Sequence, residues 1–219
     1  MTVYIPSRGA KDWRPLLGDP KKHWRKGYSA HSIAHSWEAA RGLPPEINTV
    51  FGGNADLLFA FPEHQVKMPG KGYASQCDVF ALVRYDGQTI AMAVEGKVEE
   101  AIGPTVGDWL KGDKTGNRRA RLDGIAQLLG LAGKDLASLR YQLLHRSAAA
   151  VVESQRIGLS RAALIVQSFS PKDTGLDDYK AFTTALGVPT VLGKRVTADL
   201  PGGIKLDLAW VRGKVPKTK

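Results

Sequence analysis

The chain has 219 residues, one cysteine and a formal net charge of +10 at pH 7. This length fits a single domain of the larger kind, and one cysteine excludes an internal disulfide framework and favours the reducing cytoplasm. No run of roughly 18 apolar residues indicates a membrane span, and the N-terminus lacks the apolar core of a signal peptide. Because the charge is strongly positive and no basic amphipathic helix is evident, we expect nucleic acid, and not a membrane, as the partner.

The N-terminal part of the chain predicts a helical segment. A short strand is expected at residues 2–6, followed by a polar stretch. Ser29 is expected to cap a helix that Gly42 ends, and the proline pair at 44–45 opens a second, shorter helix.

Apolar runs then predict three strands. Residues 57–61, extended by 64–68, form the first, and an Asp-Gly turn at 86–87 joins residues 75–85 and 88–97 in a hairpin. The strand before the turn is apolar on both faces, which is typical of a central strand covered by helices on both sides.

The remaining elements complete an α/β pattern. After a basic segment we expect two helices, a strand, a further helix and a terminal β-hairpin, at residues 117–131, 135–156, 162–169, 177–186, and 194–200 with 204–212. No repeat and no dividing linker is evident, so residues 1–219 are interpreted as one domain with an N-terminal helical segment and a C-terminal β-hairpin.

The central hairpin sets two carboxylates opposite each other. With the turn at 86–87, counting outward pairs Asp78 with Glu95, and Lys97 returns to the same face two residues later. Directly opposed Cβ atoms lie about 5 Å apart, so the two acids repel each other unless a cation holds both ionised. Mg²⁺ accepts carboxylates together with phosphate oxygens and waters, and the pattern therefore predicts a metal site beside a lysine.

At these residues the chain resembles the PD-(D/E)XK nuclease superfamily, which has the restriction-endonuclease-like fold. Asp78 matches the lone aspartate and Glu95-Gly96-Lys97 matches the E-x-K triplet, while Cys77 stands where many members have proline. The order helix, three strands, helix, strand is also the core order of that superfamily. The resemblance implies a mixed central sheet flanked by helices on both faces and a nuclease that uses Mg²⁺, with Mn²⁺ able to substitute.

The resemblance also suggests roles for residues around the hairpin. Asp78, Glu95 and the carbonyl of Gly96 would hold the metal, and Lys97 would position water or stabilise charge on the phosphate. Many such nucleases carry an acid on the first helix that helps hold a metal, a role that fits Glu38; the alternative is a solvated helix face.

Two further positions lie on the long predicted helix. Gln142 is expected to orient the site, or else to make a buried hydrogen bond. Some relatives have a tyrosine one turn after this glutamine, and Arg146 departs from that pattern.

A basic cluster follows the hairpin. Arg118, Arg119 and Arg121 are candidates for phosphate contacts, and their alternative is a solvated helix start.

Two other chemistries remain open. His31, His35 and Glu38 share a helix face at spacings that could bind zinc, and Cys77 could be a nucleophile with a histidine. A lone cysteine in a strand is, however, usually a small buried hydrophobic residue.

The function predicted from the sequence is a metal-dependent nuclease, with DNA as the expected substrate. The first alternative is a catalytically inactive nucleic-acid-binding protein on the same fold. The second is an enzyme acting on small phosphorylated or acidic molecules, for which the basic surface would only improve solubility.

Overall fold

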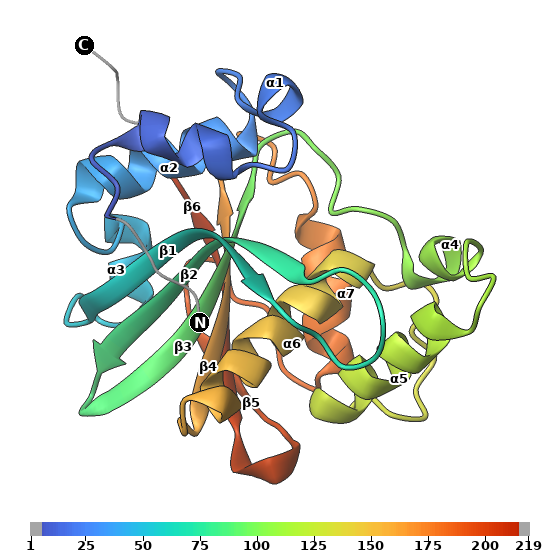
Figure 1. The fold of residues 1–219 in the computed structure, drawn as a ribbon. Helices are drawn as coiled ribbons and strands as arrows, with labels where there is room; N and C mark the ends of the chain where they lie inside the picture. The colour runs from blue at the N-terminus through green and yellow to red at the C-terminus, as the bar shows by residue number, and fades with distance from the viewer. Residues whose placement is uncertain (1–5, 215–219) are drawn as a thin grey trace.

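A mixed six-stranded sheet forms the centre of the molecule, in the order β1-β2-β3-β4-β6-β5 (Figure 1). The computed structural model describes residues 6–214. The strands β1, β2 and β3 are antiparallel neighbours, β3, β4 and β6 are parallel, and β5 is antiparallel to β6. The strands are β1 (Asp56–Val66), β2 (Ser75–Tyr85), β3 (Gln88–Lys97), β4 (Arg161–Ser168), β5 (Val196–Asp199) and β6 (Lys205–Arg212).

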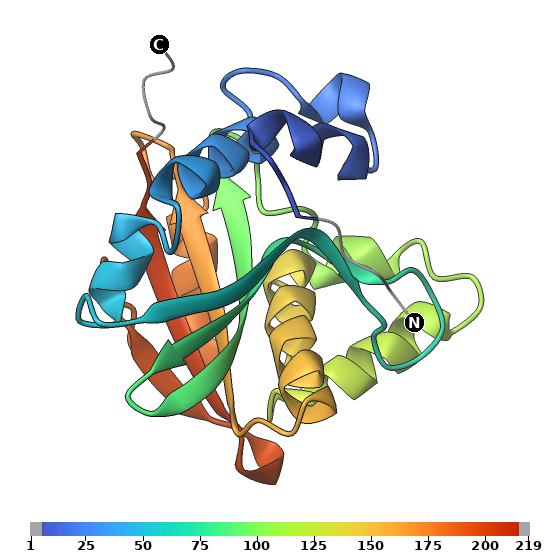
Figure 2. The ribbon, with the colours of Figure 1, turned by 60° about the vertical axis from the view of Figure 1, so that its left-hand side comes forward.

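Helices cover both faces of this sheet (Figure 2). One face carries η1 (Ala10–Leu16), α1 (Pro20–His23), α2 (Ser29–Ala40) and α3 (Pro45–Val50). The long helix α6 (Tyr141–Arg156) lies on the other face, accompanied by α4 (Val106–Leu110), α5 (Asn117–Leu128) and α7 (Leu176–Ala185), and a short turn, η2 (Pro201–Gly203), joins β5 to β6. The predicted α/β class with a mixed sheet between helices is therefore confirmed.

The alternation of apolar residues along β2 builds two separate cores. Val79, Ala81 and Val83 pack with the buried side chains of α2 and α3, whereas Phe80 and Leu82 pack towards α5 and α6. Because the strand is apolar on both faces, it must lie inside the sheet, and it pairs with β1 on one side and β3 on the other.

Two boundaries differ from the sequence prediction for reasons of backbone pairing. The long helix begins at Tyr141 because Arg140 forms a β-bridge with Thr105, which holds the preceding residues in an extended connection. The first strand is continuous from Asp56 to Val66, although Glu63 within it has a positive φ of 54°.

The N-terminal segment also departs from the expected helix ends. Ser29 is the first residue of α2 and does not cap it, and Arg41 ends the helix with a φ of 50°, one residue before the expected glycine. Most of the strand expected at 2–6 lies outside the described residues, and Pro6 is not in a strand. Between residues 6 and 214, no helix combines the length and the apolar character that crossing a bilayer requires.

Candidate functional site

The hairpin brings Asp78 to the start of the Glu95-Gly96-Lys97 segment, as its register predicts. The strands pair from Tyr85 with Gln88 outward to Val79 with Val94, and Asp78 and Glu95 are the next residues on each strand. The Oδ2 atom of Asp78 accepts a hydrogen bond of 2.8 Å from the backbone N–H of Gly96.

Gly96 lies where the surrounding side chains leave little space for a Cβ atom. A Cβ at Gly96 would lie 3.3 Å from Oδ2 of Asp78 and 3.3 Å from the side chain of Ile33 on α2. The carboxylate of Asp78 therefore approaches the backbone of β3 on a side where any larger residue would force Asp78 or Ile33 to shift by a few tenths of an ångström.

Glu95 is buried, and both of its carboxylate oxygens accept hydrogen bonds. Its Oε1 accepts hydrogen bonds from Lys97 Nζ at 2.9 Å and from Gln142 Nε2 at 2.7 Å, and its Oε2 accepts one from Arg146 Nε at 2.6 Å. Burial alone would raise the pKa of Glu95, but the charges of Lys97 and Arg146 outweigh it and lower that pKa below its ordinary value.

The structure brings Lys97 and Gln142 together as the sequence suggested. Lys97 Nζ donates to Gln142 Oε1 at 3.0 Å as well as to Glu95, so one amide contacts both catalytic candidates. Burial disfavours the charged amine, yet the charges of Glu95 and Asp78 raise the pKa of Lys97 above its ordinary value. Lys97 is therefore protonated at neutral pH.

Arg146 is a member of the site that the sequence singled out only as a departure from a pattern. It lies one helical turn after Gln142 on α6, and its side chain is buried against Glu95. A second guanidinium nitrogen donates to Ser75 Oγ at 3.0 Å, at the start of β2. The i, i+4 spacing of Gln142 and Arg146 was the available signal, because it puts both side chains on one face of the helix.

Glu63 is a third carboxylate that sequence reasoning missed. The register of β1 against β2 pairs Pro62 with Val79 and His64 with Cys77, which puts Glu63 opposite Asp78. Burial first, and then the charge of Asp78, raise the pKa of Glu63 to about 8. Glu63 lies between the two apolar runs that predicted the strand, so the sequence placed it in an interruption of the strand and not opposite Asp78.

The electrostatics of the three acids are unequal. Burial and the charge of Glu95 raise the pKa of Asp78, and neither Asp78 nor Glu63 forms an ion pair among residues 6–214. Within residues 6–214, the one hydrogen bond to the Glu63 side chain comes from Gln76 Nε2, at 2.7 Å. Two carboxyl groups that form no ion pair in the described part of the chain suit a hard divalent ion, so the donor set fits Mg²⁺ or Mn²⁺. No three His, Cys, Asp or Glu side chains of the described part of the chain are already gathered as a metal site.

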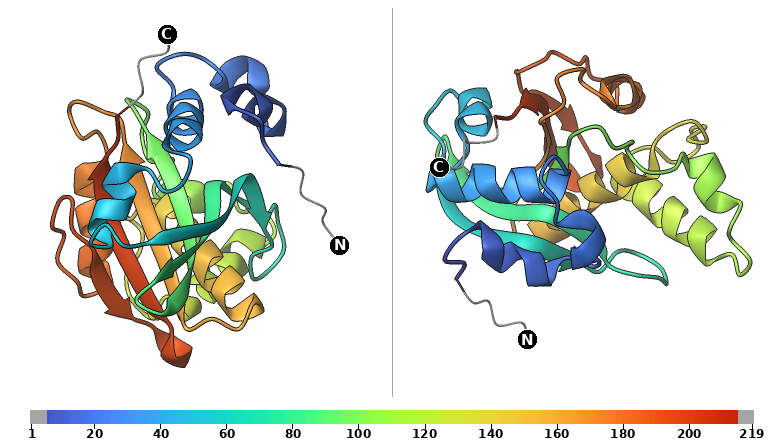
Figure 3. Two further views of the ribbon diagram at one scale, coloured as in Figure 1. Left: turned by 90° about the vertical axis from the view of Figure 1, so that its left-hand side faces the viewer. Right: turned by 90° about the horizontal axis from the view of Figure 1, so that it is seen from above.

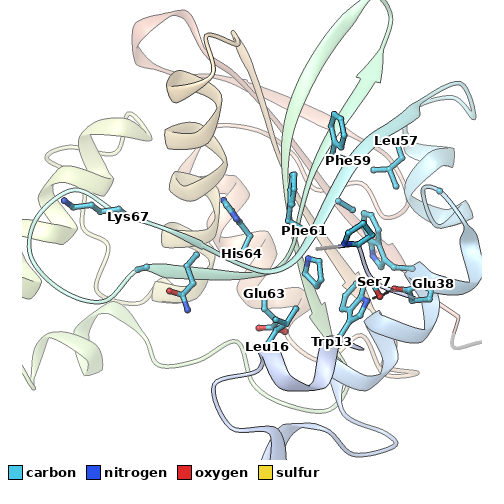
Figure 4. A pocket seen from close by; sticks show the side chains of 17 residues that line it. Ser7, Trp13, Leu16, Glu38, Leu57, Phe59, Phe61, Glu63, His64 and Lys67 are labelled. Atoms are coloured by element: carbon cyan, nitrogen blue, oxygen red, sulfur yellow. Dashed lines mark hydrogen bonds between the residues drawn. The ribbon is translucent and has the colours of Figure 1, made fainter. Parts of the chain in front are cut away.

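Glu38 accepts hydrogen bonds from two donors of the N-terminal segment. Its Oε1 accepts hydrogen bonds from Ser7 Oγ at 2.6 Å and from Trp13 Nε1 at 2.7 Å. Glu38 and Glu63 both line a cavity of about 1170 Å³ between β1 and the N-terminal helices, and Figure 4 shows Glu38 beside Ser7 and Trp13 and Glu63 beside Leu16. Outside the hairpin, the charge of Asp78 raises the pKa of Glu63 on β1.

The three arginines of the basic cluster point in different directions. Arg119 is exposed. Arg118 is half-buried, lies over the ring of Trp109 and donates to its carbonyl. Arg121 is buried and donates to Tyr141 Oη at 2.8 Å. Only Arg119 therefore has its guanidinium free of such internal contacts.

The histidine pair on α2 packs against an aromatic ring. The ring centroids of His31 and His35 are 4.3 Å apart, and Trp24 lies over both. Burial and then the charge of His35 lower the pKa of His31. The pair joins the N-terminal turn to α2 through ring contacts, and it is not grouped with a third ligand.

Cys77 is a buried residue of the core. Burial raises the pKa of its thiol to about 12, so a thiolate nucleophile is not available at neutral pH. The interpretation as a small hydrophobic residue is confirmed.

Comparison with known proteins shows a family and no described relative. The model of the family described as a domain of unknown function, DUF6946, matches residues 6–215, and the chain belongs to that family. No curated protein and no solved structure gives a significant match.

Proposed function

We propose that this member of the DUF6946 family is a metal-dependent nuclease that hydrolyses phosphodiester bonds, with DNA as the expected substrate. The observation that carries the proposal is the hairpin that sets Asp78 beside Gly96, next to Glu95, with the buried Lys97 bonded to Glu95. Glu63 lies opposite Asp78 in the register of the neighbouring strand and adds a third candidate ligand. The net charge of +10 supports a polyanionic substrate.

The acidic residues have different proposed roles. Asp78 and Glu63, with the carbonyl of Gly96, would hold Mg²⁺ or Mn²⁺, and Glu95 would complete the acidic side of the site. The bound ion would polarise a phosphate oxygen and lower the pKa of a water molecule.

Lys97 supplies a fixed positive charge for the developing phosphorane. Its Nζ is held between Glu95 and Gln142, so its position is set before substrate arrives and no reorganisation is needed. Gln142 acts on the reaction through Lys97 and Glu95, as a positioning residue.

The direct test is cleavage of plasmid DNA, linear DNA and RNA by purified protein with Mg²⁺ or Mn²⁺. Asp78→Asn should abolish cleavage, and Asp108→Asn, which changes an exposed acid on α4, should leave it intact. Absence of cleavage of all three substrates with either ion would rule out the proposal.

A second function is favoured by one contact. The guanidinium of Arg146 occupies one oxygen of Glu95, where a nuclease would place its ion. A protein that binds nucleic acid without hydrolysing it would keep its affinity in the presence of chelator and after Glu95→Gln, and would cleave nothing at any metal concentration.

A further inference from the structure

The loop between β1 and β2, residues 67–74, is fastened to the helices beside it. Met68 is buried, and a Cβ at Gly70 would lie 3.2 Å from the Cα atom of Arg121. Arg121 donates one hydrogen bond to the carbonyl of Tyr73 at 2.5 Å and another to Tyr141 Oη. The buried arginine therefore fixes the backbone of the loop at Tyr73.

The side chain on this fixed backbone faces solvent. Tyr73 is 95 % exposed, the highest exposed fraction among the large hydrophobic residues of the described chain. Lys67 and Lys71 in the same loop are also exposed, and residues 67–74 include no acid. An exposed aromatic ring in the same loop as two exposed lysines, on a held backbone, matches the chemistry of single-strand recognition, in which bases stack on aromatic rings and phosphates contact lysines.

The loop leads directly into the acid cluster. Two residues after Tyr73, Ser75 contacts Arg146, and Arg146 contacts Glu95. An extended chain advances about 3.3 Å per residue, so Tyr73 lies at most roughly 17 Å from Asp78. That distance is about five stacked base steps of 3.4 Å. One strand can therefore reach both the ring and the acids.

A second basic surface lies across from the loop. Seen from above, the loop projects between the N-terminal helices and the α4–α5 pair (Figure 3, right). The N-terminal helices and the turns beside them carry exposed cations, among them Lys11, Arg14, Lys21, Lys22 and Arg25. These cations and the two loop lysines offer positive charge to a phosphate backbone that runs past the loop.

We propose that Tyr73 is a stacking platform for an unpaired base, with Lys67 and Lys71 contacting the flanking phosphates, so that the ligand is a nucleic acid with a single-stranded segment. The proposal rests on the proposed function in one respect, that the strand held by Tyr73 is the one presented to the acid cluster. A base inside a duplex offers no free face, and Tyr73 therefore discriminates in favour of unpaired strands.

The test measures binding in the presence of chelator, so that cleavage plays no part. Wild type, Tyr73→Ala and Tyr73→Phe are titrated with a fluorescent single strand, the same strand with abasic sites, and its duplex. Tyr73→Ala should weaken single-strand binding by roughly tenfold, about 1.4 kcal/mol. Tyr73→Phe should bind the single strand as tightly as wild type does. The abasic strand and the duplex should each bind wild type and Tyr73→Ala with equal affinity. Ile157→Ala, at the far end of α6, is the control and should change nothing.

The outcomes separate this proposal from the nuclease proposal. If Tyr73→Ala binds the single strand as tightly as wild type does, or loses duplex affinity by the same factor, the stacking platform is wrong. If the binding pattern is as expected and metal-dependent cleavage is absent, the platform stands and the nuclease proposal fails. Lys71→Ala should weaken binding to all three ligands and reduce the salt dependence by about one phosphate contact.

Discussion

Arg146 donates a 2.6 Å hydrogen bond from its Nε atom to Oε2 of Glu95, with both side chains buried. The site thus carries a cation of its own on one side, where Glu95 is satisfied. The other two acids, Asp78 and Glu63, have no such partner within the described chain. This asymmetry means that an added ion is expected on the side of β1 and β2.

Removing the buried arginine should cost stability. Arg146→Met leaves Glu95 with only Lys97 as a cationic partner, so we expect a loss of about 3–5 kcal/mol in the free energy of unfolding. Denaturant unfolding with chelator measures it. Arg156→Met, which removes the exposed partner of Glu153 on the same helix, should cost at most about 1 kcal/mol. Equal losses in the two variants would contradict the role given to Arg146.

Stability should fall as pH rises in the absence of metal. The pKa of Glu63 is raised from 4.5 to about 8 by burial and by Asp78. A raised pKa means that the folded state prefers the protonated acid, so the stabilisation is full below pH 4.5 and is lost as pH rises through about 8. Glu63→Gln should flatten this decline, and Asp177→Asn, at an exposed position, should not. Unfolding free energies at several pH values measure the slope.

Metal should stabilise the fold through Glu63 and Asp78. An ion that binds only the folded state at a hundredfold excess over Kd adds about 2.7 kcal/mol. Melting curves with and without Mn²⁺ should show the shift in wild type and in Glu38→Gln, but not in Asp78→Asn or Glu63→Gln. Without metal, Asp78→Asn should melt no lower than wild type, because it relieves repulsion. If the Mn²⁺-induced shift in melting temperature persists in Glu63→Gln and disappears in Glu38→Gln, the metal ligand is Glu38 on α2 and not Glu63.

Lys97 should matter for the chemical step and not for metal binding. Lys97→Ala should keep the Mn²⁺-induced shift in melting temperature while cleavage falls by about 100-fold or more, because a fixed charge near the reacting phosphate is lost. Lys111→Ala, which removes an exposed lysine on the α4–α5 connection, is the matched control and should cleave at close to the wild-type rate. If Lys97→Ala loses the Mn²⁺-induced shift in melting temperature, the lysine instead holds the metal ligands in position.

Local rules predicted the parts of the site that lie within one turn or one hairpin. The Asp-Gly turn fixed the pairing of Asp78 with Glu95, and helical spacing related Gln142 to Arg146. The sequence did not identify Glu63 as part of the site, because residue propensities do not predict a positive φ at a glutamate within a strand.

The sequence also could not predict whether a polar side chain points towards the site or away from it. Closeness in sequence grouped Arg121 with Arg119, but Arg121 is buried and donates to the carbonyl of Tyr73. Glu38 was expected at the metal from its place on the first helix, and the donors that hold it, Ser7 and Trp13, are distant in sequence. Such long-range partners cannot be read from spacing.

The strand order has a consequence for how the molecule assembles. The strands β1, β2 and β3 are consecutive and antiparallel, so their contacts close short loops, whereas β4 reaches β3 only after the crossover that contains α6. The three acids are therefore expected to meet early in folding, before Arg146 arrives to neutralise one of them. Refolding in chelator should then be faster at pH 5 than at pH 8, and Glu63→Gln should reduce the difference in stopped-flow rates. Equal rates at the two pH values would place the docking of α6 before the closure of the strands.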